Sequence, residues 1–110
     1  MPDDFFGGLD FGTSGARISI INTNKELKFS NLVNYKYGFK NPNSWINSCE
    51  NLLDSLPPEI KRNIVNLAIS GTSGTLTACT LQGVPKGEAI PYYQACNGNE
   101  TLIKSITVGE

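Results

Sequence analysis

The chain has 110 residues, of which 39% are hydrophobic and 17% are charged, and its net charge is −1 at pH 7. This composition is typical of one modest globular domain, since a chain of this size buries roughly two-thirds of its unfolded surface. The balanced charge provides no basic cluster, so we expect neither a nucleic acid nor a membrane as a partner. The sequence contains no histidine. That excludes the Ser/His/Asp triad and most transition-metal sites.

The cellular compartment follows from the apolar segments and the cysteines. No apolar stretch approaches the ~20 residues of a membrane-spanning helix. The start MPDDFFGG carries two acids and lacks the basic region of a secretory signal. Cys49, Cys79 and Cys96 are odd in number and lack C-x-x-C spacing, which favours buried thiols over a disulfide or a zinc site. We therefore expect a protein of a reducing compartment, the cytoplasm.

The first third of the chain predicts three strands in a row. Residues 5–11 are apolar and rich in aromatic side chains, and residues 16–21 alternate apolar and polar side chains with a period of two. Residues 22–25 are typical of a turn, because asparagine tolerates the left-handed backbone region. A third apolar run extends from residue 27 to about residue 37. Short turns between successive strands predict an antiparallel meander.

A helix is predicted next, with Asn41 as the N-cap and Pro42 at the first helical position. Two prolines at 57 and 58 end it, and residues 59–63 add a helical turn. One apolar stripe of this helix should face a core. Its members are Trp45, Ile46, Cys49, Leu52, Leu53 and Leu56.

Further strands are predicted at residues 66–69, 75–81 and 88–93, with Gln82 and Gly83 as a turn between the last two. A meander followed by a crossover helix and another strand predicts a mixed sheet with the helix on one face. The fold class is therefore α/β. After Cys96 the sequence is polar and predicts no element.

A Gly-Thr-Ser-Gly turn at residues 12–15 joins the first two predicted strands. Gly12 and Gly15 permit positive φ and a close approach of the backbone. Thr13 and Ser14 add two hydroxyls to the backbone N–H groups. A concave run of amides of this kind holds phosphate oxygens well.

Two charged residues flank this turn. Asp10 stands in an otherwise apolar strand, where an unused carboxylate would be expensive to bury. Beside a phosphate it would hold Mg²⁺ or the water bound to it. Arg17 follows the turn at a distance from which its guanidinium can bind a phosphate. An isolated GTSG would favour a plain hairpin, but the D-x-G-T-S-G-x-R pattern favours a site for phosphate and magnesium.

The same tetrapeptide returns at residues 71–74, again after an apolar run. Ile69 takes the place of Asp10, so this copy has no carboxylate for a metal. A simple turn and a site for a neutral polyhydroxylated ligand are both open for it. The hydroxyls available to such a ligand are those of Thr72, Ser73 and Thr75. If both copies serve one site, they should lie side by side at one end of the sheet.

These segments resemble a known family. GLDFGTSGARISII resembles the phosphate-1 motif of the superfamily that contains sugar kinases, actin and heat-shock chaperones. NLAISGTSGTLTACTLQGVPKGEAIPYYQAC resembles the FGGY-type carbohydrate kinases, and its G-T-S-G-T and Y-x-Q-A-C segments look most like the branch acting on ketopentoses such as ribulose or xylulose. The resemblance covers residues 6 to about 97. We expect residues 1–97 to be the N-terminal part of the first kinase domain, and residues 98–110 remain unassigned.

The resemblance implies an RNase-H-like (actin-like ATPase) fold, present in part, and ATP-dependent phosphorylation of a sugar hydroxyl by the complete protein. It implies that Asp10 lies near Mg²⁺, through water, and near the reacting hydroxyl. The residues that would line the ATP phosphates are Gly12, Thr13, Ser14 and Arg17. Those that would face the sugar are Thr72, Ser73, Gly74, Tyr93 and Gln94. Tyr92 and Gln94 stand where many members of the family carry Trp and Asp.

Kinases of this family have several hundred residues in two domains, with the catalytic Asp in a later segment and the adenosine pocket in the second domain. The resemblance therefore implies an N-terminal fragment that contains no catalytic base and is inactive alone. We expect such a fragment to expose apolar surface and an unpaired strand edge, both of which can recruit a second copy.

Two other classes of protein stay open. The first is a non-enzymatic nucleotide-binding domain like that of actin or the heat-shock chaperones, against which the second GTSG argues. The second is a small carbohydrate-binding module, which would not need Asp10 and Arg17 beside a phosphate-type turn. A response of the protein to sugar would separate the kinase from the first alternative.

Overall fold

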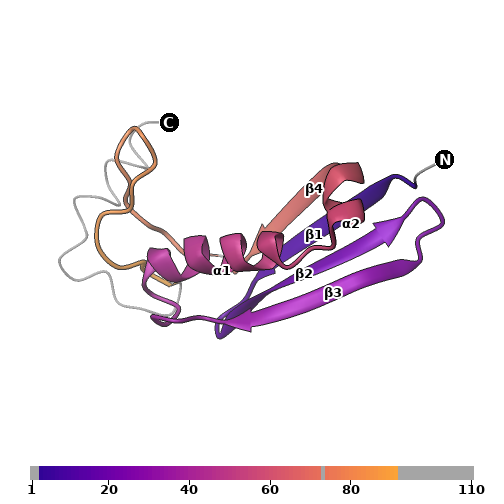
Figure 1. Cartoon of the computed structure of the whole chain (residues 1–110). Coiled ribbons are helices and arrows are strands. Elements are labelled where there is room, and N and C mark those ends of the chain that lie inside the picture. Colours follow the sequence, from indigo (N-terminus) through magenta and orange to yellow (C-terminus); the bar gives the residue numbers. More distant parts are fainter. Residues whose placement is uncertain (1–2, 73, 92–110) are drawn as a thin grey trace.

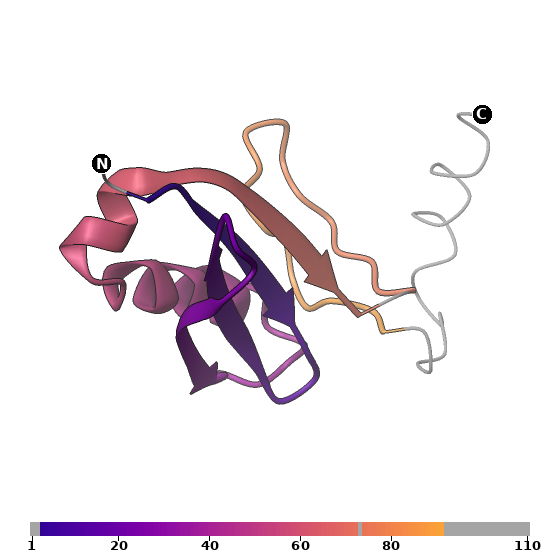
Figure 2. The same cartoon turned by 90° about the vertical axis from the view of Figure 1, so that its right-hand side faces the viewer.

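Four strands form one mixed sheet, and a helix crosses one of its faces (Figures 1 and 2). The computed structural model describes residues 3–72 and 74–91. Across the sheet the order is β3-β2-β1-β4. β2 is antiparallel to both β1 and β3, whereas β4 is parallel to β1. The elements are β1 (Phe5–Phe11), β2 (Gly15–Asn22), β3 (Leu27–Asn34), α1 (Pro42–Asp54), α2 (Pro58–Asn63) and β4 (Ile64–Gly71).

The predicted meander, crossover helix and mixed sheet are confirmed. Parallel strands need a long crossover connection, and the segment from the end of β3 to the start of β4, which contains α1 and α2, supplies it. The core lies between the sheet and the helices. Leu9 of β1, Ile18 and Ile20 of β2, and Leu52 of α1 are fully or almost fully buried there.

The predicted apolar stripe of α1 faces the core in part. Leu52 and Leu56 are buried and Cys49 and Leu53 pack against the core, whereas Ile46 is 45% exposed and Trp45 is half-buried. Ser44 and Ser48, which were not predicted, are buried as well. Two small serines on the buried face let the helix approach the sheet closely, and this places the larger Trp45 and Ile46 to the side. α1 contacts β2 and β3. None of the helices in the described part of the chain is long and apolar enough to cross a membrane.

The predicted helix cap and first turn are present. The Asn41 side chain accepts a hydrogen bond from the Asn43 amide, at 3.0 Å, and Pro42 begins α1. In the turn between β2 and β3, however, the residue with positive φ is Lys25, at 64°, and not an asparagine. The buried Asn22 acts through its side chain instead, because its Oδ1 accepts the amides of Asn24 and Glu26, both at 3.0 Å.

Regular strands at residues 75–81 and 88–93 are not formed within the described residues, so this prediction is wrong as far as residue 91. The chain there folds back on itself through isolated bridges, Leu76 with Ile90 and Cys79 with Pro85. Pro85 has no N–H to donate, and Gly87 has a φ of 83°, so a continuous ladder cannot pass through them. The predicted turn at residues 82–83 is present, since the Gly83 amide donates to the Thr80 carbonyl at 2.9 Å.

The cysteines only partly match the expectation of buried thiols. Cys49 is half-buried, and burial together with the nearby Glu50 carboxylate raises the pKa of its thiol. Cys79 is exposed, so the expectation is wrong for that residue, because its hairpin extends beyond the sheet (Figure 1). Cys96 lies outside the described residues.

Gly15 permits a test of how closely β2 and β3 approach at the first GTSG turn. A Cβ atom at this position would overlap the Val33 carbonyl oxygen and would lie 3.0 Å from the Asn34 Cα. Both are backbone atoms that cannot move independently, so Gly15→Ala should lower the free energy of unfolding by about 2 kcal/mol. Gly8→Ala is the matched control, since a Cβ there meets nothing within 4 Å. Equal urea-unfolding midpoints for the two variants would contradict this packing.

Candidate functional site

The two GTSG segments lie at the same end of the sheet, next to each other. Because β1 and β4 are parallel, Asp10 pairs with Ser70, and Phe11 pairs with Gly71 immediately beyond them. The chain therefore leaves both strands at neighbouring points (Figure 2). This confirms the expectation that the two copies lie side by side, although Ser73 of the second copy lies outside the described residues.

The first copy closes the hairpin between β1 and β2. The Gly12 amide donates to the Gly15 carbonyl at 2.9 Å, and the Thr13 and Ser14 side chains are exposed. Within residues 3–72 and 74–91, the amides of Thr13 and Ser14 have no protein acceptor, so they are free to bind a ligand. Neither Gly12 nor Gly15 uses the positive φ that a glycine permits. The predicted close approach is right for Gly15, which lies against β3.

A hydrogen bond joins the ends of the two parallel strands on the face of the sheet opposite α1. The Ser70 hydroxyl donates to Asp10 Oδ1 at 3.0 Å. Arg17 pairs with Asp10 on the other side, and both side chains are exposed. In the described part of the chain the one ion pair joins Lys61 and Asp54, so the Arg17 guanidinium is not engaged by Asp10. A shallow groove of about 270 Å³ runs past all three residues.

The arrangement around Asp10 limits how a metal ion could bind. Within the described residues no three His, Cys, Asp or Glu side chains come together as a ligand set. Asp10 therefore provides a single carboxylate, of which Oδ1 is engaged by Ser70. Mg²⁺ is commonly held by one or two carboxylates together with waters and substrate phosphates. The residues present fit that mode of binding and not a cage made of protein ligands alone.

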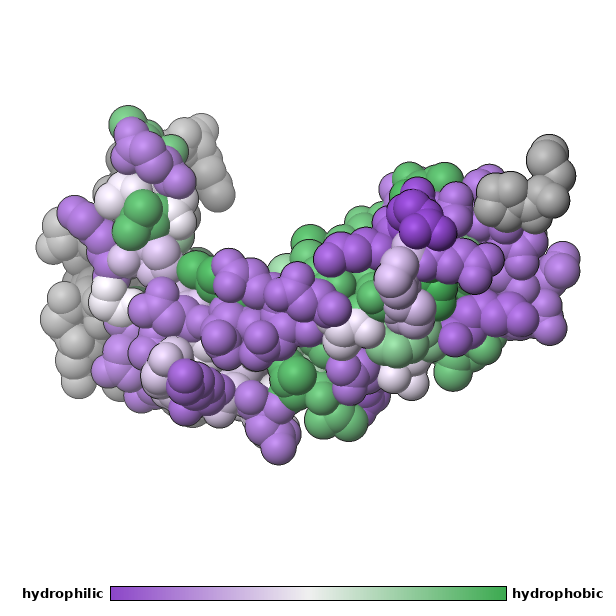
Figure 3. All heavy atoms as spheres, viewed as in Figure 1, coloured by the Kyte–Doolittle hydropathy of each residue, from purple (hydrophilic) through white to green (hydrophobic). Residues whose placement is uncertain are grey.

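The second GTSG segment borders a cavity of about 300 Å³ on the α1 side of the sheet. It forms because α1 lies over β2 and β3 and leaves the end of β4 uncovered. The surface is concave between the sheet and the hairpin that follows β4 (Figure 3). Its aromatic walls are Phe11, Phe39 and Trp45, and its threonines are Thr72, Thr75 and Thr77.

Two contacts shape this cavity. The Trp45 indole N–H donates to the Phe39 carbonyl at 2.9 Å, which fixes the aromatic wall. Thr72 Oγ1 and Thr75 Oγ1 lie 3.0 Å apart and share a hydrogen bond. Gly74 between them has a φ of 67°, so this copy of the tetrapeptide uses the left-handed backbone that the first copy does not. A cavity with hydroxyls on one side and aromatic rings on the other suits a small ligand with both polar and apolar faces.

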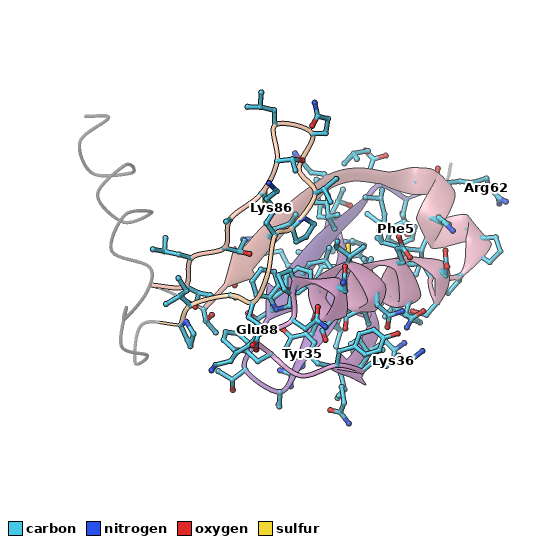
Figure 4. All side chains as sticks on the ribbon, turned by 90° about the vertical axis from the view of Figure 1, so that its left-hand side faces the viewer. Phe5, Tyr35, Lys36, Arg62, Lys86 and Glu88 are labelled. Atoms are coloured by element: carbon cyan, nitrogen blue, oxygen red, sulfur yellow. The ribbon has the colours of Figure 1, made fainter. Side chains whose placement is uncertain are left out.

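Two contact residues of this site were not expected from the sequence. Ser70 had a weak signal, as a polar residue between an apolar strand and the second GTSG. Tyr35 had no signal in the sequence. Its hydroxyl donates to the Gly12 carbonyl at 2.7 Å, and Gly12 lies 23 residues away along the chain. Tyr35 is marked in Figure 4. Tyr93 and Gln94 lie outside the described residues, so their expected roles stay predictions.

No family model matches the sequence. Among solved structures, a xyloylose kinase from Brucella ovis is similar over 78% of this chain, at a TM-score of 0.70 and 20% sequence identity. A gluconate kinase from Lactobacillus acidophilus is similar over 96% of the chain, with a TM-score of 0.72 and 13% identity. A glycerol kinase from Plasmodium falciparum, solved with ADP, is similar over 98%, with a TM-score of 0.65 and 13% identity.

The chain thus has the fold of a segment of sugar kinases, a partial actin-like ATPase fold, as the resemblance in the sequence implied. It spans 20%, 22% and 24% of the lengths of these three kinases, respectively. What they share with this chain is the arrangement of strands and helix that brings the two GTSG segments together.

The closeness of Asp10 to Tyr35 can be tested by titration. Burial raises the pKa of the Tyr35 phenol, and the negative charge of Asp10 raises it further, because a tyrosinate would repel the carboxylate. Asp10→Asn should therefore lower the pKa of Tyr35 towards its ordinary value without removing the part due to burial. NMR of ¹³C-labelled tyrosine would measure it, with Asp4→Asn as the control at the opposite end of β1. An equal change in both variants would contradict the proximity.

Proposed function

We propose that this chain is the phosphate- and sugar-binding segment of an ATP-dependent carbohydrate kinase. The observation that carries the proposal is the pair of GTSG segments on adjacent parallel strands, with the Asp10 carboxylate hydrogen-bonded to Ser70 between them. One turn with free amides and one turn with hydroxyls, held side by side, suit a reaction that must bring a nucleotide phosphate to a sugar. The similar structures are those of a xyloylose kinase, a gluconate kinase and a glycerol kinase, which supports the same class of reaction.

In this proposal the first GTSG turn binds the ATP phosphates. The amides of Thr13 and Ser14 have no protein acceptor within the described residues, and both side chains are exposed. Backbone N–H groups and a guanidinium without a carboxylate partner both stabilise negative charge spread over phosphate oxygens. The guanidinium here is that of Arg17, which lies on the same face of the sheet as Asp10.

Asp10 serves the transferring phosphate. Mg²⁺, when bound there through water, neutralises charge on the phosphates and so lowers the barrier to their transfer. Ser70 fixes one oxygen of the Asp10 carboxylate, so the other is presented to the ligand in a defined direction. Asp10 is then occupied as an anchor. We therefore place the base that deprotonates the sugar hydroxyl outside this chain.

The sugar lies against the second GTSG turn, where Thr72 borders the aromatic cavity and Gly74 is a further expected contact. Thr72 and Thr75 present hydroxyls to it, and Trp45 and Phe39 form an apolar wall. We favour a ketopentose such as ribulose or xylulose, with Ser73, Tyr93 and Gln94 as further contacts. The resemblance of the G-T-S-G-T and Y-x-Q-A-C segments supports this choice, as does the name of the Brucella ovis protein. An enzyme of this kind would act in the cytoplasm, where ATP is available.

Activity measurements test the proposal directly. The complete kinase that contains this chain should consume ATP only in the presence of a sugar or polyol, and the 110-residue chain alone should show no such turnover. An actin- or chaperone-like domain would bind ATP without any response to sugar. A carbohydrate-binding module would bind sugar without any response to ATP.

Asp10→Asn in the complete protein should lower kcat at least about 100-fold and leave the fold intact, because a metal anchor supplies several kcal/mol to the transition state. An asparagine still accepts the Ser70 hydrogen bond, so the free energy of unfolding should stay within about 0.5 kcal/mol of the natural value. A coupled assay of ATP consumption measures the first quantity and urea unfolding the second. Asp4→Asn is the charge-matched control. Near-normal turnover of Asp10→Asn would refute the role of Asp10.

We also propose that the 110-residue chain self-associates through β4. Within the described sheet β4 is an edge strand, and Val65, Leu67 and Ile69 are exposed along it. Unpaired edges with apolar side chains recruit further strands, and an edge lysine prevents this. Val65→Lys should therefore reduce the apparent mass in light scattering. Leu81→Lys, at a fully exposed apolar residue outside the strand, should not. A chain that stays monomeric at high concentration would contradict the proposal.

A further inference from the structure

The first GTSG turn is held from outside by one residue, Tyr35. This residue follows β3 directly, and its phenol donates to the Gly12 carbonyl at 2.7 Å. Its backbone amide donates to the Ser14 carbonyl at 3.0 Å. The two bonds therefore reach the turn on both sides of Thr13, one from the side chain and one from the main chain.

The position of Tyr35 is itself fixed. Its ring lies beside Phe39, with centroids 6.3 Å apart, and Phe39 in turn lies 6.2 Å from Trp45 of α1. The backbone before it is anchored because Gly15 pairs with Asn34 in the β2–β3 ladder. A turn that is exposed on its own is thus connected to the helix through a row of three aromatic rings.

These tethers bear on the peptide groups that the ligand would use. The carbonyl groups of Gly12 and Ser14 are turned to Tyr35, and each belongs to the same peptide unit as the amide of the next residue. Fixing the Gly12 carbonyl therefore orients the Thr13 amide, which has no acceptor within the described residues. Donors that are oriented before the ligand arrives bind it more tightly, since less ordering is needed on binding.

We infer that Tyr35 is a positioning residue for the phosphate-binding turn, acting through the hydrogen bond of its hydroxyl to the Gly12 carbonyl. The inference rests on the proposed function for the ligand, whereas the tether itself can be tested without any ligand. The hydroxyl is a donor at neutral pH because a phenol ordinarily loses its proton only near pH 10, and burial and the nearby Asp10 carboxylate raise the pKa of Tyr35 further.

Tyr35→Phe removes the hydroxyl and keeps the ring and the backbone tether. Hydrogen exchange of the Gly12 and Tyr35 amides, measured by NMR on the 110-residue chain, should become about 10-fold faster. Binding of MgATP to the complete protein that contains this chain should weaken about 3- to 10-fold, as expected for one net hydrogen bond. Tyr37→Phe is the matched control, since Tyr37 is 54% exposed and lies two residues away. It should change neither quantity.

In the complete kinase, Tyr35→Phe should raise KM for ATP and leave KM for the sugar unchanged, and the urea-unfolding midpoint should stay close to that of Tyr37→Phe. A loss of activity caused only by weaker folding would lower the apparent kcat and the midpoint together and leave both KM values unchanged, which would overturn the inference. Unchanged exchange of the Gly12 and Tyr35 amides would overturn the tether. Faster exchange with unchanged MgATP affinity would overturn its role in phosphate binding.

Failure of the proposed function gives a different result. In that case the natural chain would show protected turn amides that lose protection in Tyr35→Phe, but the complete protein would not bind MgATP, either with its natural sequence or with the Tyr35→Phe substitution. This outcome would overturn the ligand assigned to the turn, and with it the positioning role. The earlier outcomes concern Tyr35 in a protein that does bind MgATP.

Discussion

The parallel pairing of β1 with β4 is the constraint on which the rest of the site depends. Two parallel strands end at the same edge of a sheet, so their following segments must emerge together. This pairing exists because α1 and α2 carry the chain from the end of β3 back to the start of a strand beside β1. Asp10 and Ser70, 60 residues apart, can form a hydrogen bond only in this register.

The position of α1 decides what each face of this edge offers. The small side chains of Ser44 and Ser48 are buried on the helix, and the helix lies over β2 and β3. The corner of the sheet above β4 is left open, so aromatic side chains from α1 and the segment before it line a cavity instead of filling a core. The opposite face carries Asp10 and Arg17 and remains polar. One strand end therefore has an apolar and a charged side.

The two identical tetrapeptides illustrate how context decides conformation. The first closes an antiparallel hairpin, where Gly15 is needed because β3 passes too close for a side chain, and its backbone stays in the ordinary regions. The second follows an edge strand into a hairpin outside the sheet, and its last residue, Gly74, adopts positive φ. Glycine serves close approach in one copy and backbone freedom in the other. The same tetrapeptide therefore meets two different requirements, close contact with a neighbouring strand at Gly15 and positive φ at Gly74.

The sequence by itself determined the elements whose signals are local. An apolar run rich in aromatic residues predicted β1, and period-two alternation predicted β2. The Asn41–Pro42 pair predicted the start of α1, and the order of elements predicted a mixed α/β sheet with neighbouring GTSG segments. Each of these depends on residues that are close along the chain or on general rules of connection.

Tertiary structure decided what depends on partners far apart in the sequence. The buried face of α1 includes Ser44 and Ser48 beside the predicted Leu52, and such small side chains allow a helix to lie close to a sheet. The predicted strands after β4 became isolated bridges because Pro85 and Gly87 interrupt pairing once the chain folds back on itself. Ser70 and Tyr35 reached the site through contacts across 60 and 23 residues, which no local pattern encodes, because a hydrogen bond depends on distance in space.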